Sequence, residues 1–128
     1  TGYTYLGKTY YNPYNIGAYS DANPVMRGME YAKSQGWDSK EKAVFGGAKF
    51  IANGYIKKGQ NSVYFQKFNV ANGPSRVGTH QYMTNISAGY TESISTKNSY
   101  SAYGITNESL VFIIPVFSNM PASTSLPH

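Results

Sequence analysis

Tyrosine limits what this chain can build as a hydrophobic core. Thirteen of the 128 residues are Tyr, and they are included in an apolar fraction of only 41%. A chain of 14.1 kDa can bury one modest core, and because its aliphatic side chains are few, Tyr and Phe must fill much of that core. The chain has no Cys, which excludes disulfides, thiolate metal sites and a Cys nucleophile. We expect one domain whose rings serve both the interior and the surface.

The net charge of the chain indicates which kinds of partner it can bind. Eleven Lys and Arg against six Asp and Glu give a net charge of +5, which favours polyanionic partners such as nucleic acid, an anionic membrane face or an acidic wall polymer. The basic residues are spread along the chain, only Lys57 and Lys58 are adjacent, and there are two Arg, so we expect no nucleic-acid partner. The longest apolar run, residues 110–117, is too short to cross a bilayer, and we expect no membrane span.

Capping signals predict two successive helices. Asn23 can cap a helix that has Pro24 in its first position, and Gly36 can end it after about Ser34. The second helix is predicted over residues 39–58. Its start is a capping box in form, in which Asp38 accepts from the backbone and Glu41 reaches back, and its stop is Gly59.

Two features near these helices need close packing. The Gly46-Gly47 pair costs about 1 kcal/mol per Gly relative to Ala inside a helix, so we expect a close contact or a nearby ligand there. Trp37, the only Trp, lies between the two helices. A core plug at this corner is favoured over a sugar platform because the ring can bury a large area.

The second half of the chain gives weaker signals. Residues 63–68 and 78–83 are predicted to pair as a β-hairpin, with His80 and Tyr82 on one face and Gln81 on the other.

A further helix is predicted to begin at Thr84 or Asn85, and the Ser-rich run 93–101 is a place where it could break in two. Residues 110–117 are predicted to be extended, at a sheet edge because Pro115 cannot donate a ladder hydrogen bond, or as a packed tail.

The best candidate for function is Gly78-Thr79-His80-Gln81-Tyr82, with the Tyr-rich stretch 10–19 as its partner. Hydroxylated rings, amides and a histidine suit a polar ligand with flat faces, such as a sugar. No Asp or Glu lies near His80 in sequence, so we expect neither a Ser-His-Asp triad nor a metal site, and no cofactor. Asp21 is the carboxylate best placed for catalysis, although helix capping or complementing the helix dipole is the role that its position favours more.

A series of segments in matching order resembles the endo-β-N-acetylglucosaminidase domain of bacterial wall autolysins, glycoside hydrolase family 73. The matching segments are Tyr11-Asn12, Ile16-Gly17-Ala18-Tyr19, Asn23-Pro24, Gln35-Gly36-Trp37, Lys42-Ala43, Gly46-Gly47-Ala48-Lys49-Phe50-Ile51, Tyr55-Ile56, Gly59-Gln60-Asn61 and Gly78-Thr79-His80-Gln81-Tyr82. The closing Ile114-Pro115-Val116-Phe117 and Asn119-Met120-Pro121 are similar to the end of this domain in clostridial and related Gram-positive enzymes.

The resemblance implies an α+β, mainly α, lysozyme-like fold with a small β-hairpin lobe, and cleavage of the N-acetylglucosaminyl β-1,4 bond in peptidoglycan. It places the general-acid Glu on a helix upstream of Thr1, so the chain is expected to lack the N-terminal part of the domain and to be inactive alone. Residues 1–121 are then a partial glucosaminidase domain, and 122–128 a disordered tail. That missing part is an expected partner if it is present as a separate fragment.

Carried over residue by residue, the resemblance gives Tyr82 as the cleft residue that supports the reacting sugar. Ser20 stands where many relatives have Asp, so either this second carboxylate is missing or Asp21 takes over its catalytic role. The predicted substrate contacts are Tyr11, Asn12, Tyr14, Tyr19, Gly78, Thr79, His80 and Gln81. The partner implied is the glycan strand of peptidoglycan, and the location is secreted or wall-associated. A noncatalytic module that binds cell-wall glycan is the alternative.

Overall fold

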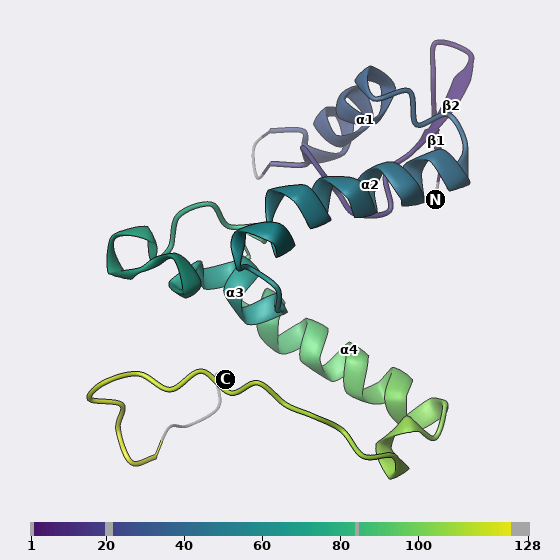
Figure 1. The fold of residues 1–128 in the computed structure, drawn as a ribbon. Coiled ribbons are helices and arrows are strands. Elements are labelled where there is room, and N and C mark those ends of the chain that lie inside the picture. The colour runs from purple at the N-terminus through teal and green to yellow at the C-terminus, as the bar shows by residue number, and fades with distance from the viewer. Residues whose placement is uncertain (1, 20–21, 84, 124–128) are drawn as a thin grey trace. The chain divides into compact units, whose positions relative to one another are not determined.

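The computed structural model describes residues 2–19, 22–83 and 85–123, and it is mainly helical (Figure 1). Contacts divide the chain into two units, Thr1–Asn85 and Ile86–His128. In the first unit the elements are β1 (Gly2–Tyr5), β2 (Lys8–Tyr11), α1 (Pro24–Ser34), α2 (Lys40–Gly54), α3 (Val63–Phe68) and the short 3-10 helices η1 (Ile56–Lys58), η2 (Val70–Asn72) and η3 (Pro74–Arg76). The second unit has α4 (Ala88–Ala102) and η4 (Ile105–Asn107).

The small sheet lies at the start of the chain and not where the sequence predicted it. Strands β1 and β2 are antiparallel, with Tyr5 opposite Lys8. The two residues between them, Leu6 and Gly7, both have positive φ, of 50° and 77°. Left-handed conformations at both central positions match the twist of a tight hairpin. The prediction of a mainly helical fold with a small hairpin is confirmed, but the position given for the hairpin was wrong.

Residues 63–68 form the helix α3 rather than a strand. The Ser62 hydroxyl accepts a hydrogen bond from the backbone N–H of Phe65 at the start, and Asn69 ends the helix in a left-handed conformation with φ 50°. A short apolar run has no decisive period, and the two polar caps decide in favour of the helix. The other half of the predicted hairpin, 78–83, is an irregular loop over its described residues.

Helix α1 begins and ends as predicted, with the Asn23 side chain accepting from the backbone N–H of Met26 and Pro24 in the first turn. Helix α2 begins one residue later than expected, because Ser39 rather than Asp38 is the cap, accepting from the backbone N–H of Lys42 at 3.2 Å. The predicted capping box was therefore wrong.

The hydrophobic core of the first unit is built from rings and small side chains. Its buried members are Tyr10, Ile16, Ala32, Trp37 and Ala43, with Tyr5, Tyr11, Tyr14, Tyr31 and Tyr82 packed against them. Trp37 is 5% exposed, and the Tyr31 ring meets it edge to face at 5.5 Å between centroids. The expectations that Tyr would fill much of the core and that Trp37 would be a core plug are confirmed.

The two glycines within α2 allow close approach of aromatic rings. A Cβ added to Gly46 would overlap the Trp37 ring, and one added to Gly47 would overlap the Tyr14 ring. Both glycines lower the helix propensity of α2, but without a Cβ they allow these rings to lie against its backbone.

In the second unit, α4 is one continuous helix through the Ser-rich run, so the break anticipated there does not occur. Its N-cap is Ser87, without a side-chain cap bond. Thr84, one of the two predicted caps, lies outside the described residues, as do residues 124–128 of the predicted tail. Residues 109–116 have no regular secondary structure.

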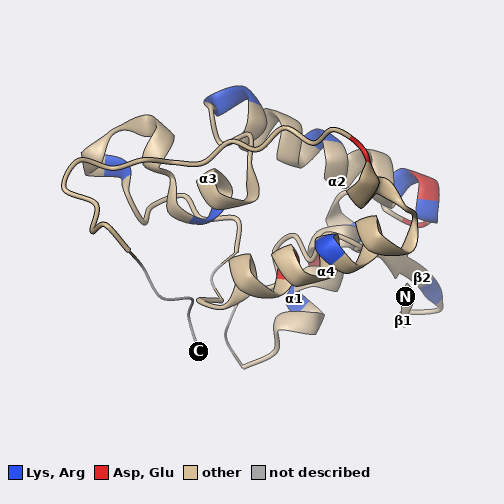
Figure 2. Cartoon of the chain, turned by 90° about the horizontal axis from the view of Figure 1, so that it is seen from below, with Lys and Arg blue, Asp and Glu red and all other residues tan. Residues whose placement is uncertain are grey.

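Charge is divided unevenly between the units. Ten of the eleven Lys and Arg, and four of the six Asp and Glu, fall in residues 1–85. Basic positions are scattered over the ribbon rather than gathered in one run (Figure 2). Within the part of the chain that the structure describes, no helix is long and apolar enough to cross a membrane.

Candidate functional site

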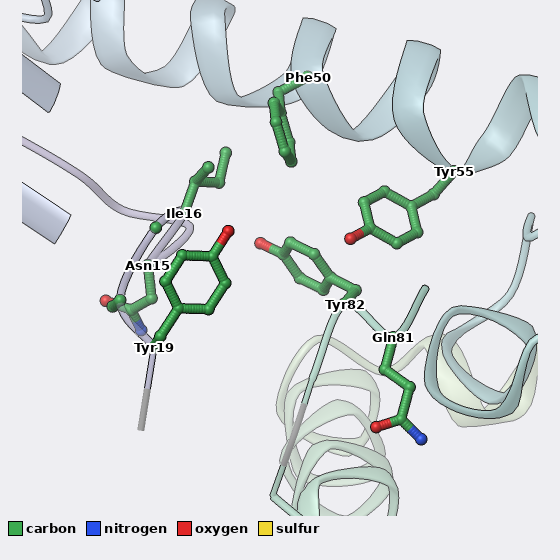
Figure 3. Close-up of a pocket in the computed structure, with 9 residues that line it drawn as sticks. Asn15, Ile16, Tyr19, Phe50, Tyr55, Gln81 and Tyr82 are labelled. Carbon is green, nitrogen blue, oxygen red and sulfur yellow. The ribbon is translucent and has the colours of Figure 1, made fainter. Parts of the chain in front are cut away.

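A small pocket of about 80 Å³ in the first unit brings together three separate stretches of sequence. The loop 15–19 forms one side, the C-terminal part of α2 gives Phe50 and, just after it, Tyr55, and the loop 78–83 gives Gln81 and Tyr82. The Tyr19 and Tyr82 side chains have their hydroxyls on facing sides, and the Tyr55 hydroxyl points toward the Tyr82 ring (Figure 3). Three phenols around one small space can donate to and accept from a polar ligand while their rings offer flat apolar faces.

Tyr82 joins the two stretches that were expected to act together. Its hydroxyl donates a 2.6 Å hydrogen bond to the backbone carbonyl of Tyr14, across 68 positions of sequence. Its ring lies edge to face with Tyr55 at 5.4 Å between centroids. This bond fixes the Tyr-rich loop against the loop that carries Tyr82.

Tyr55 lines the pocket together with residues of these two loops, and it is only 8% exposed. Burial raises the pKa of its hydroxyl, and the neighbouring Tyr19 adds to the rise. Tyr55 therefore stays protonated and able to donate at neutral pH. Tyr19 is 65% exposed, so it stands at the mouth of the pocket.

Asn12 holds the Tyr-rich loop from behind. The side chain is buried, and its amide nitrogen donates to the carbonyls of Ile16 and Gly28, each at 2.8 Å, while its oxygen accepts from the backbone N–H of Ile16 at 3.1 Å. These three hydrogen bonds all join the Asn12 side chain to backbone groups, and they hold the loop in its shape. Asn15 takes a positive φ of 52° within the turn that Asn12 braces.

The predicted site residues therefore divide by position. Those that line the pocket are Tyr19, Gln81 and Tyr82. Those behind it are Tyr11, Asn12 and Tyr14, which pack in or against the core. Gly78, Thr79 and His80 belong to the loop but not to the lining. Asp21 lies outside the described residues.

The alternation expected of a strand does not describe how the loop 78–83 presents its side chains. Gly78 and His80 have positive φ, of 75° and 48°, which turns the backbone away from an extended path. His80 stacks on the Tyr55 ring at 4.5 Å and 16°, while Gln81 points away from the three rings (Figure 3).

Phe50 and Tyr55 are pocket residues that were not predicted as such. The helix predicted over residues 39–58 includes both positions. Their signal is a pair of aromatic residues five positions apart near the end of that helix, and it cannot be distinguished from core packing.

Within the described ranges, no Asp or Glu lines this pocket. Asp38 instead pairs with Lys8 at 2.8 Å and Lys42 at 2.7 Å. Hydrogen bonds from Lys42 and Lys8 lower the pKa of its carboxyl to about 2. Backbone N–H at the start of α2, and the Ser39 hydroxyl, lower the pKa of Glu41. Both carboxylates are therefore ionised at neutral pH, and their hydrogen bonds serve the structure around the start of α2.

Comparison with known proteins points to one group of enzymes, although no protein-family model matches the chain. The bifunctional autolysin of Staphylococcus epidermidis is 41% identical over 114 residues, which is 89% of this chain and 8% of that protein. A catalytic Glu-to-Ala mutant of S. aureus autolysin E, solved with the disaccharide NAG-NAM, superposes with a TM-score of 0.62 at 33% identity, covering 80% of this chain and 44% of that one. S. aureus glucosaminidase B gives a TM-score of 0.52 at 39% identity over 78% of this chain and 38% of that one.

The chain is therefore homologous to part of the staphylococcal autolysins and glucosaminidases. It spans a small fraction of the curated relative and less than half of each solved chain.

Proposed function

We propose that this chain is part of a peptidoglycan hydrolase of glycoside hydrolase family 73 that cleaves the N-acetylglucosaminyl β-1,4 bond. Homology to autolysins and to a glucosaminidase supports the reaction, and the relative solved with NAG-NAM supports the ligand class. The observation that carries the proposal is the tie between Tyr82 and Tyr14. It assembles a phenol-lined pocket from the two segments that the family resemblance pairs.

In this proposal Tyr82 supports the reacting sugar, and Tyr19 and Gln81 contact the glycan. Tyr11, Asn12 and Tyr14 act mainly through the loop that they anchor, since their side chains are turned toward the core. Gly78, Thr79 and His80 shape the opposite loop. Asp21 is proposed as a second carboxylate on the ground of its place in sequence alone.

The general acid is proposed to be a Glu that this sequence does not supply. One carboxylic acid must protonate the departing glycosidic oxygen. The relative solved with NAG-NAM is named for a catalytic Glu. We therefore expect the 128-residue chain alone to release no reducing ends from peptidoglycan, and to regain activity only with a segment that brings such a Glu to the pocket.

Several finer assignments belong to the same proposal. Residues 1–121 are part of one glucosaminidase domain and 122–128 a tail, and the closing segment 114–121 is of the kind found in clostridial and related Gram-positive enzymes. The protein is secreted or bound to the cell wall, where its substrate lies, and the remaining part of the domain is a partner if it is a separate fragment.

A noncatalytic glycan-binding module is the second candidate. The absence of an Asp or Glu among the described pocket residues favours it, because a binding surface needs no acid. The two candidates differ in what the natural protein that carries this sequence does to purified peptidoglycan: the enzyme releases reducing ends and the module does not.

Tyr82→Phe tests the proposal directly. The variant keeps the ring but loses the bond to the Tyr14 carbonyl, which should cost about 1 kcal/mol of stability and lower turnover about ten-fold or more, since the pocket wall is no longer fixed. Turnover is measured in the natural protein as reducing ends released, and stability by thermal unfolding. Tyr103→Phe, at a Tyr that is 82% exposed, is the matched control. Unchanged turnover in Tyr82→Phe would remove Tyr82 from the mechanism.

A further inference from the structure

We propose that Gln60 is a positioning residue that holds His80 in one tautomer and fixes the loop 78–83 in the shape that the pocket requires. The inference deepens the proposed function and rests on it for its link to glycan. The hydrogen-bonded clamp itself follows from geometry and can be tested without any ligand.

Gln60 is the largest fully buried side chain among the described residues, with 0% exposure. Its amide nitrogen donates to the backbone carbonyls of Phe65 at 2.9 Å and of His80 at 3.1 Å. Its amide oxygen lies 2.7 Å from the Nδ1 of His80. All three contacts reach across to α3 and to the loop 78–83, so one amide joins both.

These contacts determine which nitrogen of His80 carries the proton. A carbonyl oxygen only accepts hydrogen bonds, so the Gln60 group that faces Phe65 O and His80 O must be the NH₂. The oxygen of the amide therefore faces Nδ1. Because that oxygen also only accepts, Nδ1 of His80 must carry a hydrogen. In the neutral ring Nε2 is then left as an acceptor on an exposed side chain.

The clamp reaches the pocket through ring contacts. His80 is held at a φ of 48°, a conformation that is unfavourable for a residue with a side chain. Its ring lies flat on Tyr55, and Tyr55 meets Tyr82 edge to face. Gln60 thus sets the position of the ring on which Tyr55 stacks, and Tyr55 in turn packs against Tyr82.

Other groups hold the same loop against α3. The Lys67 ammonium, 3% exposed as a residue, donates to the Met83 carbonyl at 2.7 Å. Backbone bonds from Gly78 to Phe68 and from Tyr82 to Gln66 complete the attachment to α3. Gln60 differs from these groups in contacting a loop side chain and a loop carbonyl together.

The first experiment needs no mutation. Imidazole ¹⁵N resonances of the full chain, measured in the neutral form of the ring, should show Nδ1 of His80 protonated and Nε2 bare. His128, the only other His, serves as an internal reference. A His80 ring protonated at Nε2 and bare at Nδ1 would overturn the inference.

Variants at position 60 separate the two hydrogen bonds that the Gln60 amide donates from the one that it accepts. Gln60→Met removes all three hydrogen bonds at similar length, and it should shift His80 toward the Nε2-protonated form and weaken binding of NAG-NAM about five-fold or more. Gln60→Glu keeps the acceptor for Nδ1–H but loses both donors, so it should retain the proton on Nδ1 while the loop loosens. Gln35→Met, at an exposed Gln, is the matched control.

The tautomer of His80 and the affinity for NAG-NAM together decide whether Gln60 positions the loop. Unchanged tautomer and unchanged binding in a folded Gln60→Met would overturn the inference. A tautomer shift with five-fold weaker binding supports it. If the wild-type chain does not bind NAG-NAM at all, the proposed function fails, whereas the wild-type tautomer still decides whether the clamp exists.

Discussion

At the scale of single residues, Asp38 joins β2 to the start of α2 through ion pairs with Lys8 and Lys42. Its spacing to Glu41 suits a capping box, but Ser39 takes the cap and leaves Asp38 to bind Lys8 and Lys42. The partner from β2, thirty positions earlier in the chain, could not be seen in local spacing. Trp37, Asn23 and Pro24 were predictable because packing of a lone large ring and helix capping are decided locally.

Asp38 also gives a pH dependence with a defined sign. Its pKa is lowered from 3.8 to about 2 in the folded chain. Stabilisation by Asp38 is therefore complete above the unfolded value and is lost as pH falls through the range from 3.8 toward about 2. Asp38→Asn should lower the Tm at pH 6, and the gap from wild type should close near pH 2.

Thermal unfolding followed by circular dichroism between pH 2 and 6 measures this gap. Glu92→Gln, an exposed change on α4, is the control and should show no such closing gap. A gap between wild type and Asp38→Asn that is the same at both ends of the pH range would contradict the assigned ion pairs.

At the scale of elements, α2 is the helix on which the site depends. Its glycines admit Trp37 and Tyr14, and its end places Phe50 and then Tyr55 at the pocket. The need for a close contact at Gly46-Gly47 was predictable from helix propensity. The ring that meets each glycine was not, because the contacts come from loops before the helix.

Gly47→Ala tests this contact. The added methyl would overlap the Tyr14 ring, so we expect a loss of about 1–3 kcal/mol in the free energy of unfolding, as for an overpacked core. The displaced Tyr14 would also strain the carbonyl that Tyr82 binds. Denaturant unfolding of the full chain gives the measurement.

Gly54→Ala is the matched control, since it lies in the same helix with nothing within 4 Å of an added Cβ. Its higher helix propensity should leave stability equal or raise it by up to about 1 kcal/mol. Equal behaviour of the two variants would show that Tyr14 does not need Gly47.

The hairpin and α3 mark the limit of element prediction. Residues 63–68 carry aromatic and β-branched side chains, and only the caps at Ser62 and Asn69 distinguish a helix. The pair Leu6 and Gly7 forms the actual hairpin turn, although Leu is an unusual residue for a positive φ. Hairpin prediction depends on turn residues, and here the turn lacks the usual Asn or Asp.

At the scale of the whole molecule, the helical class and the pairing of two distant segments could be predicted from sequence, but the geometry between those segments could not. Their polar, aromatic side chains predicted that residues 10–19 and 78–82 act together, and the bond from Tyr82 to Tyr14 supplies the physical link. Buried groups such as Gln60 carry no periodic signal, because their importance comes from what they contact. Ten of the eleven basic residues lie in the unit that holds the pocket, and this positive charge favours attraction to an anionic polymer.

The central claim is that the phenol-lined pocket of residues 15–19, 50–55 and 81–82 binds peptidoglycan glycan. Titration of the ¹⁵N-labelled chain with NAG-NAM, followed by NMR, tests it most directly. We predict saturable shifts for Tyr19, Tyr55, Gln81 and Tyr82, with exposed residues of the second unit such as Tyr103 unmoved. No shift at the pocket, or saturable shifts confined to other residues, would contradict the account.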